Sequence, residues 1–481
     1  MRMKIFEKYY KSIKKNRHKF QKYLEELDKE KNINKKLEIA QDAVDFALFK
    51  NCGYFSCAKL ENFYCNIAEN IDINLQAEYK NNSVLHVMTN ASTNGGHTRI
   101  VEKWIEYAPN TEEHSVILIN QTKNEPLNRL KKAVTEKKGK IIKLKNNNLL
   151  DKAKELRQKA SQYDYIVLHI HMNDPCALIA FGTNKFKRPI IFFNHSDHTF
   201  WLGICISDIV ADLSKNRTYF TKIIRKAKNN LALCVPYEEN INIKNKTDAR
   251  NKFNLDSNAK IILTAGSSGK YVQLKNYTII DIFENCLTEH KDTILIAIGP
   301  KSKEWKQLKH KYKDRVLLLK KADYETDYFD YLTAADIVID SFPMSGGTVM
   351  IDAINTKTPV LSLENPIGQF DYLVNTDAYC KEKAELKKKL NRILTDESYK
   401  LQIIKQLQDG ITAECSKEKF IEKLTHIKSL LPSQHLLYKF EDTEASSEYY
   451  NLCVLLNFIY SKDYYKAKKR KFIKKILSIF K

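Results

Sequence analysis

The chain has 481 residues, of which 80 are lysine or arginine and 58 are aspartate or glutamate, so its formal net charge is +22. A hydrophobic fraction of 43% and an aromatic fraction of 11% exclude disorder on a large scale, and the length suits two domains with appendages. The excess of positive charge favours a polyanionic partner, which could be nucleic acid, an anionic membrane surface or a phosphorylated substrate.

The amino-terminal stretch MRMKIFEKYYKSIKKNRHKF lacks the apolar core of a signal peptide, and no apolar run of membrane-spanning length follows. Ten cysteines are scattered without a CxxC pair. That usage is typical of reduced thiols that fill the core of a cytosolic protein. We therefore expect a cytoplasmic location.

Residues 1–78 predict a helical cap, because apolar residues recur every three or four positions in KLEIAQDAVDFALF and CAKLENFYCNIAENI. From 79 to 243 the pattern changes. Short apolar runs, among them SVLHVMT, SVILIN, DYIVLHIH and PIIFFN, alternate with helical stretches. Such alternation predicts a parallel sheet flanked by helices.

A polar stretch at 244–258 is expected to link this domain to a second one at 258–400, where the alternation restarts with KIILTAG, TILIAIGP, IVIDSFP and PVLSL. Residues 401–481 predict a helical region with a basic amphipathic tail. The predicted fold class is α/β, with two Rossmann-like doubly wound domains facing a cleft. Paired domains of this kind bind ligands at the carboxyl ends of their strands.

Polar clusters follow three predicted strands of the first domain, in NASTNGGHTRIVEKW, LHIHMNDP and NHSDHTFWLG. His97 stands out because a glycine loop presents it at a helix start, where it can take a proton from a substrate hydroxyl if its pKa stays near neutral. His86, in the middle of a strand, is expected to be buried and hydrogen-bonded. The candidate site residues of this domain are Gly96, His97, Thr98, His171, Asp174, His195, Asp197 and His198.

A metal is an alternative for His195, Asp197 and His198, but no third ligand at a spacing such as HExxH accompanies them. The aspartate could equally hold a histidine ring in one tautomer. We expect no metal.

The second domain contains VIDSFPMSGGTVMIDAINTKTPVLSLEN, in which a short strand is followed by a turn, a helix and another strand. Thr348 can cap the helix, and Gly346 and Gly347 let a phosphate approach its amides, so a nucleotide diphosphate fits. The alternative is that the glycines merely permit a turn with positive φ. Lys270 follows the strand IILTA and is expected at the same edge.

The glycine-histidine loop and the segment DSFPMSGGTVMIDAINTKTPVLSL resemble those of glycosyltransferases with the GT-B fold. The similarity is greatest to the branch of the protein O-linked N-acetylglucosamine transferases and the bacterial cytoplasmic N-glucosyltransferases, with related bacterial polysaccharide enzymes. NHSDHTFWLG is similar to a stretch in bacterial enzymes of this kind. The resemblance covers about residues 83–400.

The resemblance implies a UDP-sugar as substrate and no required cofactor. It makes Gly346, Gly347 and Thr348 the diphosphate cradle. Asp352 is implied to accept hydrogen bonds from the ribose hydroxyls, and Lys270 to neutralise the departing diphosphate. His97, with His195 and Asp197, is implied in catalysis, and the remaining candidates of the first domain lie on the acceptor side.

Two positions depart from the family pattern or bear on stereochemistry. Val349 stands where the family often has a second hydroxyl residue, which puts one phosphate contact in question. Met344 stands where retaining enzymes commonly carry a glutamate, so the resemblance favours inversion by direct displacement.

The carboxyl-terminal stretch YYKAKKRKFIKKILSIFK puts Phe472, Ile473, Ile476, Leu477 and Phe480 on one helical face. Residues 464–481 could therefore lie in an anionic membrane interface, or the apolar face could pack on its own domain. The expected acceptor is a glycan, a lipid-linked glycan or a protein. Alternatives to a transferase are a sugar-nucleotide epimerase of the same fold, a scaffold with a degenerate site and a basic nucleic-acid-binding protein, although no nucleic-acid module is recognisable.

Overall fold

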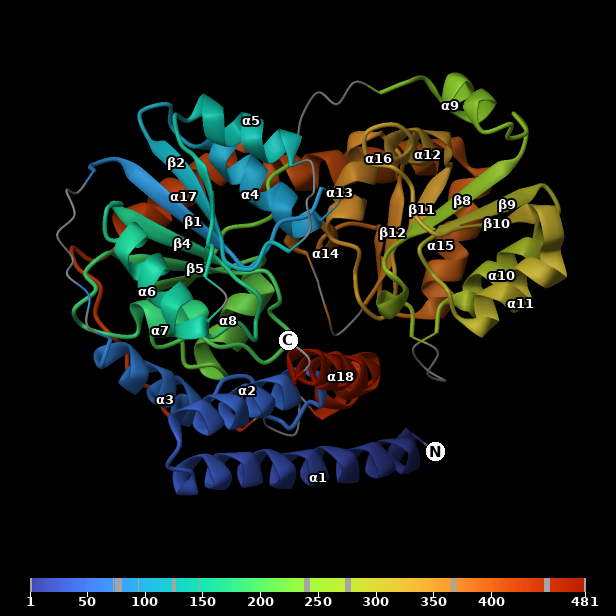
Figure 1. Ribbon diagram of the computed structural model, residues 1–481. Coiled ribbons are helices and arrows are strands. Elements are labelled where there is room, and N and C mark those ends of the chain that lie inside the picture. Colours follow the sequence, from blue (N-terminus) through green and yellow to red (C-terminus); the bar gives the residue numbers. More distant parts are fainter. Residues whose placement is uncertain are drawn as a thin grey trace. The chain divides into compact units, whose positions relative to one another are not determined.

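The computed structural model describes residues 2–71, 73, 80–93, 95–122, 127–146, 148–237, 243–272, 278–364, 367, 370–444 and 450–479, with the backbone alone at 2–9, 450–451, 470–472 and 474–479. The chain forms two compact units (Figure 1). One unit comprises Met1–Leu233 and Lys423–Lys481, and the other comprises Cys234–Glu422.

The first unit contains a parallel seven-stranded sheet in the order β3-β2-β1-β4-β5-β6-β7. The chain enters at β1, moves outward to β3 and returns to β4 on the other side of β1. This reversal creates a switch point, where loops leave the carboxyl ends of β1 and β4 in opposite directions. The strands are β1 (Ser83–Met88), β2 (Glu113–Leu118), β3 (Ile141–Lys143), β4 (Tyr165–His169), β5 (Ile190–Asn194), β6 (Ile209–Asp212) and β7 (Asn230–Ala232).

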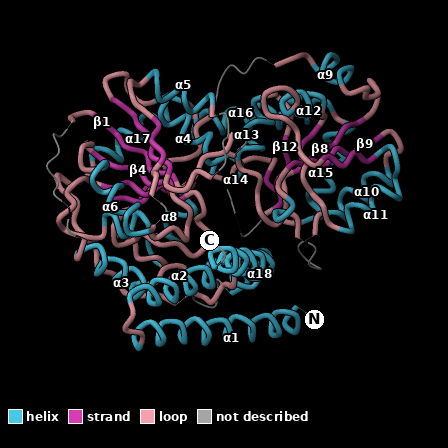
Figure 2. Tube along the Cα trace, in the orientation of Figure 1, coloured by secondary structure: helices cyan, strands magenta, loops and turns pink. Residues whose placement is uncertain are grey.

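Helices accompany the strands of this sheet, as the cyan and magenta segments of Figure 2 show. Every residue of β1 and β4 is buried, which is expected of parallel strands that are covered on both faces. The helices are α4 (Gly96–Tyr107), α5 (Asn128–Glu136), α6 (Leu149–Ala160), α7 (Cys176–Phe181) and α8 (Lys215–Ile223).

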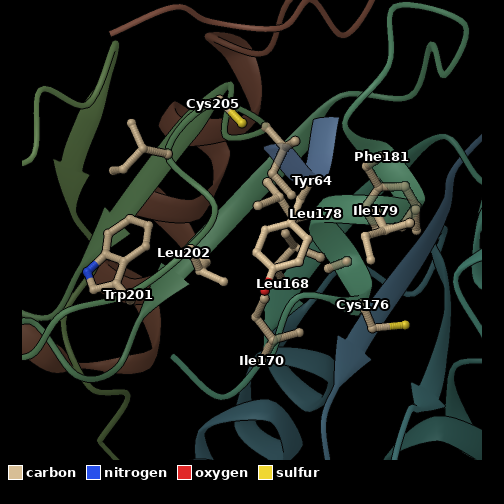
Figure 3. Packing of buried hydrophobic residues seen from close by; sticks show 14 of the residues in the cluster. Tyr64, Leu168, Ile170, Cys176, Leu178, Ile179, Phe181, Trp201, Leu202 and Cys205 are labelled. Atoms are coloured by element: carbon tan, nitrogen blue, oxygen red, sulfur yellow. The ribbon is translucent and has the colours of Figure 1, made fainter. Parts of the chain in front are cut away.

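The helices predicted at the amino terminus are present as α1 (Arg2–Lys29), α2 (Ile33–Phe49) and α3 (Ala58–Glu69). A long helix from the other end of the chain, α18 (Tyr450–Ile479), packs on α1 and α2. In the core, the ring of Tyr64 from α3 lies beside Leu168 of β4 and Leu178 of α7 (Figure 3). The terminal helices therefore share the hydrophobic core of the first sheet.

The second unit contains a parallel six-stranded sheet in the order β10-β9-β8-β11-β12-β13, with its switch point between β8 and β11. Its strands are β8 (Lys260–Ala265), β9 (Thr293–Ile298), β10 (Val316–Leu319), β11 (Ile337–Ile339), β12 (Val360–Leu363) and β13 (Tyr379–Cys380). Its helices are α9 (Lys246–Lys252), α10 (Ile280–Glu289), α11 (Lys303–Tyr312), α12 (Tyr328–Ala334), α13 (Thr348–Asn355), α14 (Asp371–Val374), α15 (Lys383–Thr395) and α16 (Glu397–Cys415), and α17 (Lys417–Ser429) follows.

The polar stretch at 244–258, expected as a link, contains α9 and belongs to the second unit. Polar contacts hold this helix against α12: Arg250 donates to the carbonyl oxygen of Ala334 at 3.1 Å and to Asp336 at 2.8 Å. A helix that is held in place by ion pairs needs no regular spacing of apolar residues. The sequence of this segment therefore looks like that of a linker. The strands β6, β7 and β13 are not predicted from the sequence either, and β7 and β13 contain at most two consecutive apolar residues each.

All ten cysteines are free thiols and all but Cys65 are buried, which confirms that they fill the core. None of the helices in the described ranges combines the length and the hydropathy that a membrane span requires.

Candidate active site

At the switch point of the first sheet, the end of β1 is hydrogen-bonded to the polar cluster that follows β4. The Thr89 hydroxyl, just after β1, donates to Asp174 at 2.6 Å and accepts the amide of His171 at 2.9 Å. The other carboxylate oxygen of Asp174 accepts the amide of Cys176 at 3.0 Å, at the start of α7. Asp174 therefore fixes the loop after β4, and His171 in that loop is exposed.

The loop between β1 and α4 is held in the same way. The hydroxyl of Thr98 accepts the amide of Ser92 at 2.9 Å, which closes the turn that carries the exposed Gly96. Thr98 itself is buried. These contacts give Thr98 a role in shaping the loop that presents His97.

His97 and His195 lie face to face, with ring centroids 3.9 Å apart and planes inclined by 21°. Within the described chain, Nε2 of His97 and Nδ1 of His195 are buried without a hydrogen-bond partner. Buried polar nitrogens are rarely left without a partner, so each of these two has unused hydrogen-bonding capacity beside a switch point.

The electrostatic environment keeps both rings neutral. Burial and the neighbouring His195 and His171 lower the pKa of His97 well below its usual range, and burial with His171 lowers the pKa of His195 to about 3. A neutral imidazole can accept a proton at pH 7, but a low pKa makes it a weak base. The condition for His97 as a base, a pKa near neutral, is therefore not met, and the ring needs a partner that stabilises its charged form.

Asp197 belongs to a different network from His195. Its carboxylate contacts Nδ1 of His198 at 3.0 Å and Nε of Arg217 at 3.1 Å, and Nε2 of His198 meets the Tyr460 hydroxyl at 2.9 Å. Burial opposes ionisation, but Arg217 and His198 outweigh it and hold the pKa of Asp197 below its usual range. Asp197 thus orients His198 and ties α8 to α18, and a catalytic role for it stays a prediction.

The second sheet has its own polar cluster at the switch point. Asp340, directly after β11, accepts hydrogen bonds from the hydroxyls of Ser345 and Ser362 at 2.6 and 2.9 Å and from the amide of Gly346 at 2.7 Å. Burial nevertheless raises the pKa of Asp340. These bonds fold the loop back on itself directly before α13.

The glycine pair leads into α13. Gly347 is the N-cap and has φ of +28°, and a Cβ there would lie 2.8 Å from Cζ of Phe370. A Cβ on Gly346 would lie 3.2 Å from Oδ1 of Asp340. Thr348 is the first helical residue and not the cap, because Gly347 takes that position. With no side chain at the N-cap, an anion can approach the first turn, where the amide of Val349 already donates to the carbonyl oxygen of Gly346 at 2.7 Å.

Lys270 reaches the same loop from β8. Its Nζ donates to the carbonyl oxygen of Ser345 at 2.6 Å. Burial lowers the pKa of Lys270, and the nearby Asp340 opposes that change only in part. The structure therefore places the predicted lysine beside the predicted glycine loop.

Asp352 is buried on α13 and accepts the Tyr328 hydroxyl at 3.0 Å. A ribose would have to share the carboxylate with this tyrosine or replace it. Its predicted role as the ribose ligand stays a prediction.

The described parts of both units hold no group of three or more His, Cys, Asp or Glu side chains arranged to bind a metal ion. Sequence reasoning missed the contributions of Asp340, Ser345, Ser362 and Tyr328, because their partners become apparent only in the folded chain.

Neither protein-family models nor curated proteins match the sequence. Solved structures do match the chain. Anabaena HepE in complex with UDP and glucose superposes with a TM-score of 0.55 at 14% identity, covering 72% of this chain and 99% of HepE. The chain has the GT-B fold.

Two further GT-B structures agree. Sucrose-phosphate synthase from Thermosynechococcus elongatus has a TM-score of 0.52 at 14% identity and covers 72% of this chain and 98% of its own. A mutant O-GlcNAc transferase from Thermobaculum terrenum has a TM-score of 0.53 at 11% identity and covers 82% of this chain and 78% of its own. At these identities the similarity establishes the fold alone.

Proposed function

We propose that this GT-B protein is a metal-independent glycosyltransferase that moves a sugar from a UDP-sugar to an acceptor hydroxyl of a bacterial surface glycan or glycoconjugate. The observation that carries the proposal is the corner before α13, where Gly346 and Gly347 open the helix start and Lys270 lies against the loop. A helix amino terminus with an adjacent lysine suits a diphosphate. That HepE binds UDP and glucose supports a uridine donor.

On the donor side, the first-turn amides of α13 and Thr348 hold the diphosphate and Asp352 binds the ribose. Lys270 stabilises the negative charge that grows on the diphosphate as it departs. On the acceptor side, His97 takes the proton of the attacking hydroxyl while His195 packs against its ring. Gly96, His171 and His198 complete the acceptor side.

We infer inversion at the anomeric carbon, since Met344 occupies the position where retaining enzymes commonly carry a glutamate. The acceptor oxygen forms a bond to that carbon as the bond to the diphosphate oxygen breaks. One base then suffices.

A donor panel tests the proposal. Purified protein is heated with each of several sugar nucleotides, and a bound donor raises the unfolding temperature by an amount that grows with the logarithm of its concentration relative to Kd. We expect protection by a UDP-sugar that is lost in Lys270→Ala and retained in Lys306→Ala, a control at an exposed lysine on α11. Equal protection of parent and Lys270→Ala proteins would contradict the site. Turnover of a sugar nucleotide without any acceptor would indicate an epimerase instead.

We further propose that the protein works in the cytoplasm, at the inner face of the membrane, through residues 464–481. The backbone of α18 continues to Ile479, and the side chain of Ile473 is 44% exposed. Phe472, Ile476, Leu477 and Phe480, the rest of the expected apolar face, lie outside the described side chains.

A further inference from the structure

Three buried imidazoles form a hydrogen-bonded row across β2, β1 and β4. Nδ1 of His114 lies 2.9 Å from Nε2 of His86, and Nδ1 of His86 lies 3.0 Å from Nε2 of His169. At the β2 end, Nε2 of His114 lies 3.2 Å from Oε2 of Glu112, whose Oε1 contacts the ammonium of Lys428. The predicted burial and hydrogen bonding of His86 are thus confirmed.

The row has a direction. Burial lowers the pKa of His86 and of His169 well below the usual range and that of His114 to about 3, so all three rings are neutral and each has one N–H and one bare nitrogen. The carboxylate of Glu112, paired with Lys428, can only accept. Nε2 of His114 must therefore carry the proton.

The positions of the other ring protons follow from the proton on Nε2 of His114. Nδ1 of His114 is bare and accepts from Nε2 of His86, and Nδ1 of His86 in turn accepts from Nε2 of His169. Nδ1 of His169 is left with a bare lone pair. In the described part of the chain this atom is buried and has no partner.

His169, at the β4 end of the row, lies near His97 of the candidate acceptor side. His169 is the last residue of β4, and its ring centroid lies 5.9 Å from that of His97, against 5.2 Å for each bonded pair within the row. Nε2 of His97 is the buried nitrogen that also lacks a partner among the described residues. A small shift of the His97 ring, or one bridging water, would connect the two rings.

We propose that Glu112 and the imidazole row make His169 a positioning residue, whose bare Nδ1 holds and stabilises the protonated ring of His97 during sugar transfer. The proton moves from the acceptor hydroxyl to the bare nitrogen of His97 and goes no further, and His169 accepts a hydrogen bond from the N–H on the other nitrogen of the same ring. The row supplies the stabilising partner that a weakly basic imidazole needs. The role in transfer rests on the proposed function, but the direction of the row does not.

Glu112→Gln tests the direction. Lys428 can only donate, so it selects the amide oxygen of the new side chain and turns the amide N–H toward Nε2 of His114. Each ring then takes the opposite tautomer, and Nδ1 of His169 becomes protonated. Nitrogen-15 NMR of labelled histidine distinguishes protonated from bare ring nitrogens. We expect Nε2–H in His86, His114 and His169 of the parent protein and Nδ1–H in all three rings of the variant.

The control is Glu113→Gln, which removes the neighbouring ion pair with Lys80 and does not touch the row. Its tautomers should match those of the parent. Unchanged tautomers of His86 and His169 in Glu112→Gln would overturn the directing role of Glu112.

Kinetics test the positioning role. With a UDP-sugar and an acceptor that the parent protein uses, Glu112→Gln should lower kcat about tenfold and leave the donor KM unchanged, because a donor N–H now opposes protonation of His97. If Glu112→Gln does not fold, His169→Phe, which leaves no hydrogen-bond acceptor at this position, should lower kcat in the same way. Reversed tautomers with unchanged kcat would overturn the positioning role. A protein that transfers sugar from no donor would end the proposed function, while the NMR result would still decide the direction of the row.

Discussion

At the scale of single residues, Gly347 is a position in the proposed donor site that does not accept a side chain without strain. Its positive φ, and the 2.8 Å that would separate an added Cβ from the Phe370 ring, make Gly347→Ala strained. We expect a loss of about 1–2 kcal/mol in the free energy of unfolding and weaker donor binding, measured by urea unfolding and by calorimetry with UDP.

Gly269→Ala is the matched control, since a Cβ there would meet nothing within 4 Å. It should bind UDP like the parent protein. Normal UDP affinity in Gly347→Ala would mean that the nucleotide does not use this corner.

Residues at strand ends could be predicted from the sequence because each follows a recognisable apolar run. The residues that they contact could not be predicted. Lys270 is 75 residues from Ser345 in the chain, and Lys428 is 316 residues from Glu112. The burial that keeps the imidazoles neutral leaves no local pattern in the sequence. The hydrogen bonds that align the rings leave none either.

At the scale of secondary-structure elements, the imidazole row makes the first sheet sensitive to acid. A histidine whose pKa is lowered by folding binds its proton more readily in the unfolded state, so stability is complete above about pH 6.5 and falls as the pH drops toward the folded pKa. For His114 that folded pKa is about 3.

Between pH 7 and pH 5, the parent protein should lose about 2 kcal/mol more unfolding free energy than His114→Gln, which removes one titrating ring. Urea unfolding in a Trp201→Phe/Trp305→Phe background, followed by the fluorescence of Trp104, whose ring contacts His86 and His169, measures the difference. His310→Gln, at an exposed position on α11, should lose as much as the parent. Parallel losses in parent and His114→Gln proteins would show that His114 is charged or exposed in the folded state.

The end of α18 is the element for which we expect membrane binding. Each lysine near an anionic surface contributes on the order of 1 kcal/mol, so replacing Lys471, Lys474 and Lys475 by glutamine should weaken binding to phosphatidylserine vesicles roughly a hundredfold. The control replaces Lys301, Lys303 and Lys306, which are exposed in the second unit. Vesicle sedimentation gives the comparison. Equal pelleting of both variants would assign the interaction to net charge, and no pelleting of the parent would exclude it.

At the scale of the whole molecule, alternating apolar strands and amphipathic helices suffice to predict two α/β domains, because parallel strands buried on both faces give continuous apolar runs. The same rule fails for segments held by polar contacts, such as α9, and for strands as short as β13. The alternation of strands and helices also does not predict that α18 packs on α1 and α2. Hundreds of residues separate these helices, and only the folded chain brings their apolar faces together.

Because the chain divides into two units, unfolding experiments can show which unit binds the nucleotide. Trp104 and Trp201 lie in the first unit and Trp305 in the second, and all three are fully buried, so each unit has its own fluorescent reporter. UDP binding at α13 should raise the unfolding temperature seen by Trp305 in a Trp104→Phe/Trp201→Phe protein, because a ligand stabilises the part that it binds. The transition seen in Trp305→Phe should move less. An equal shift of both transitions would indicate cooperative unfolding of the units, and a shift confined to Trp104 and Trp201 would place the nucleotide on the first sheet and contradict the site.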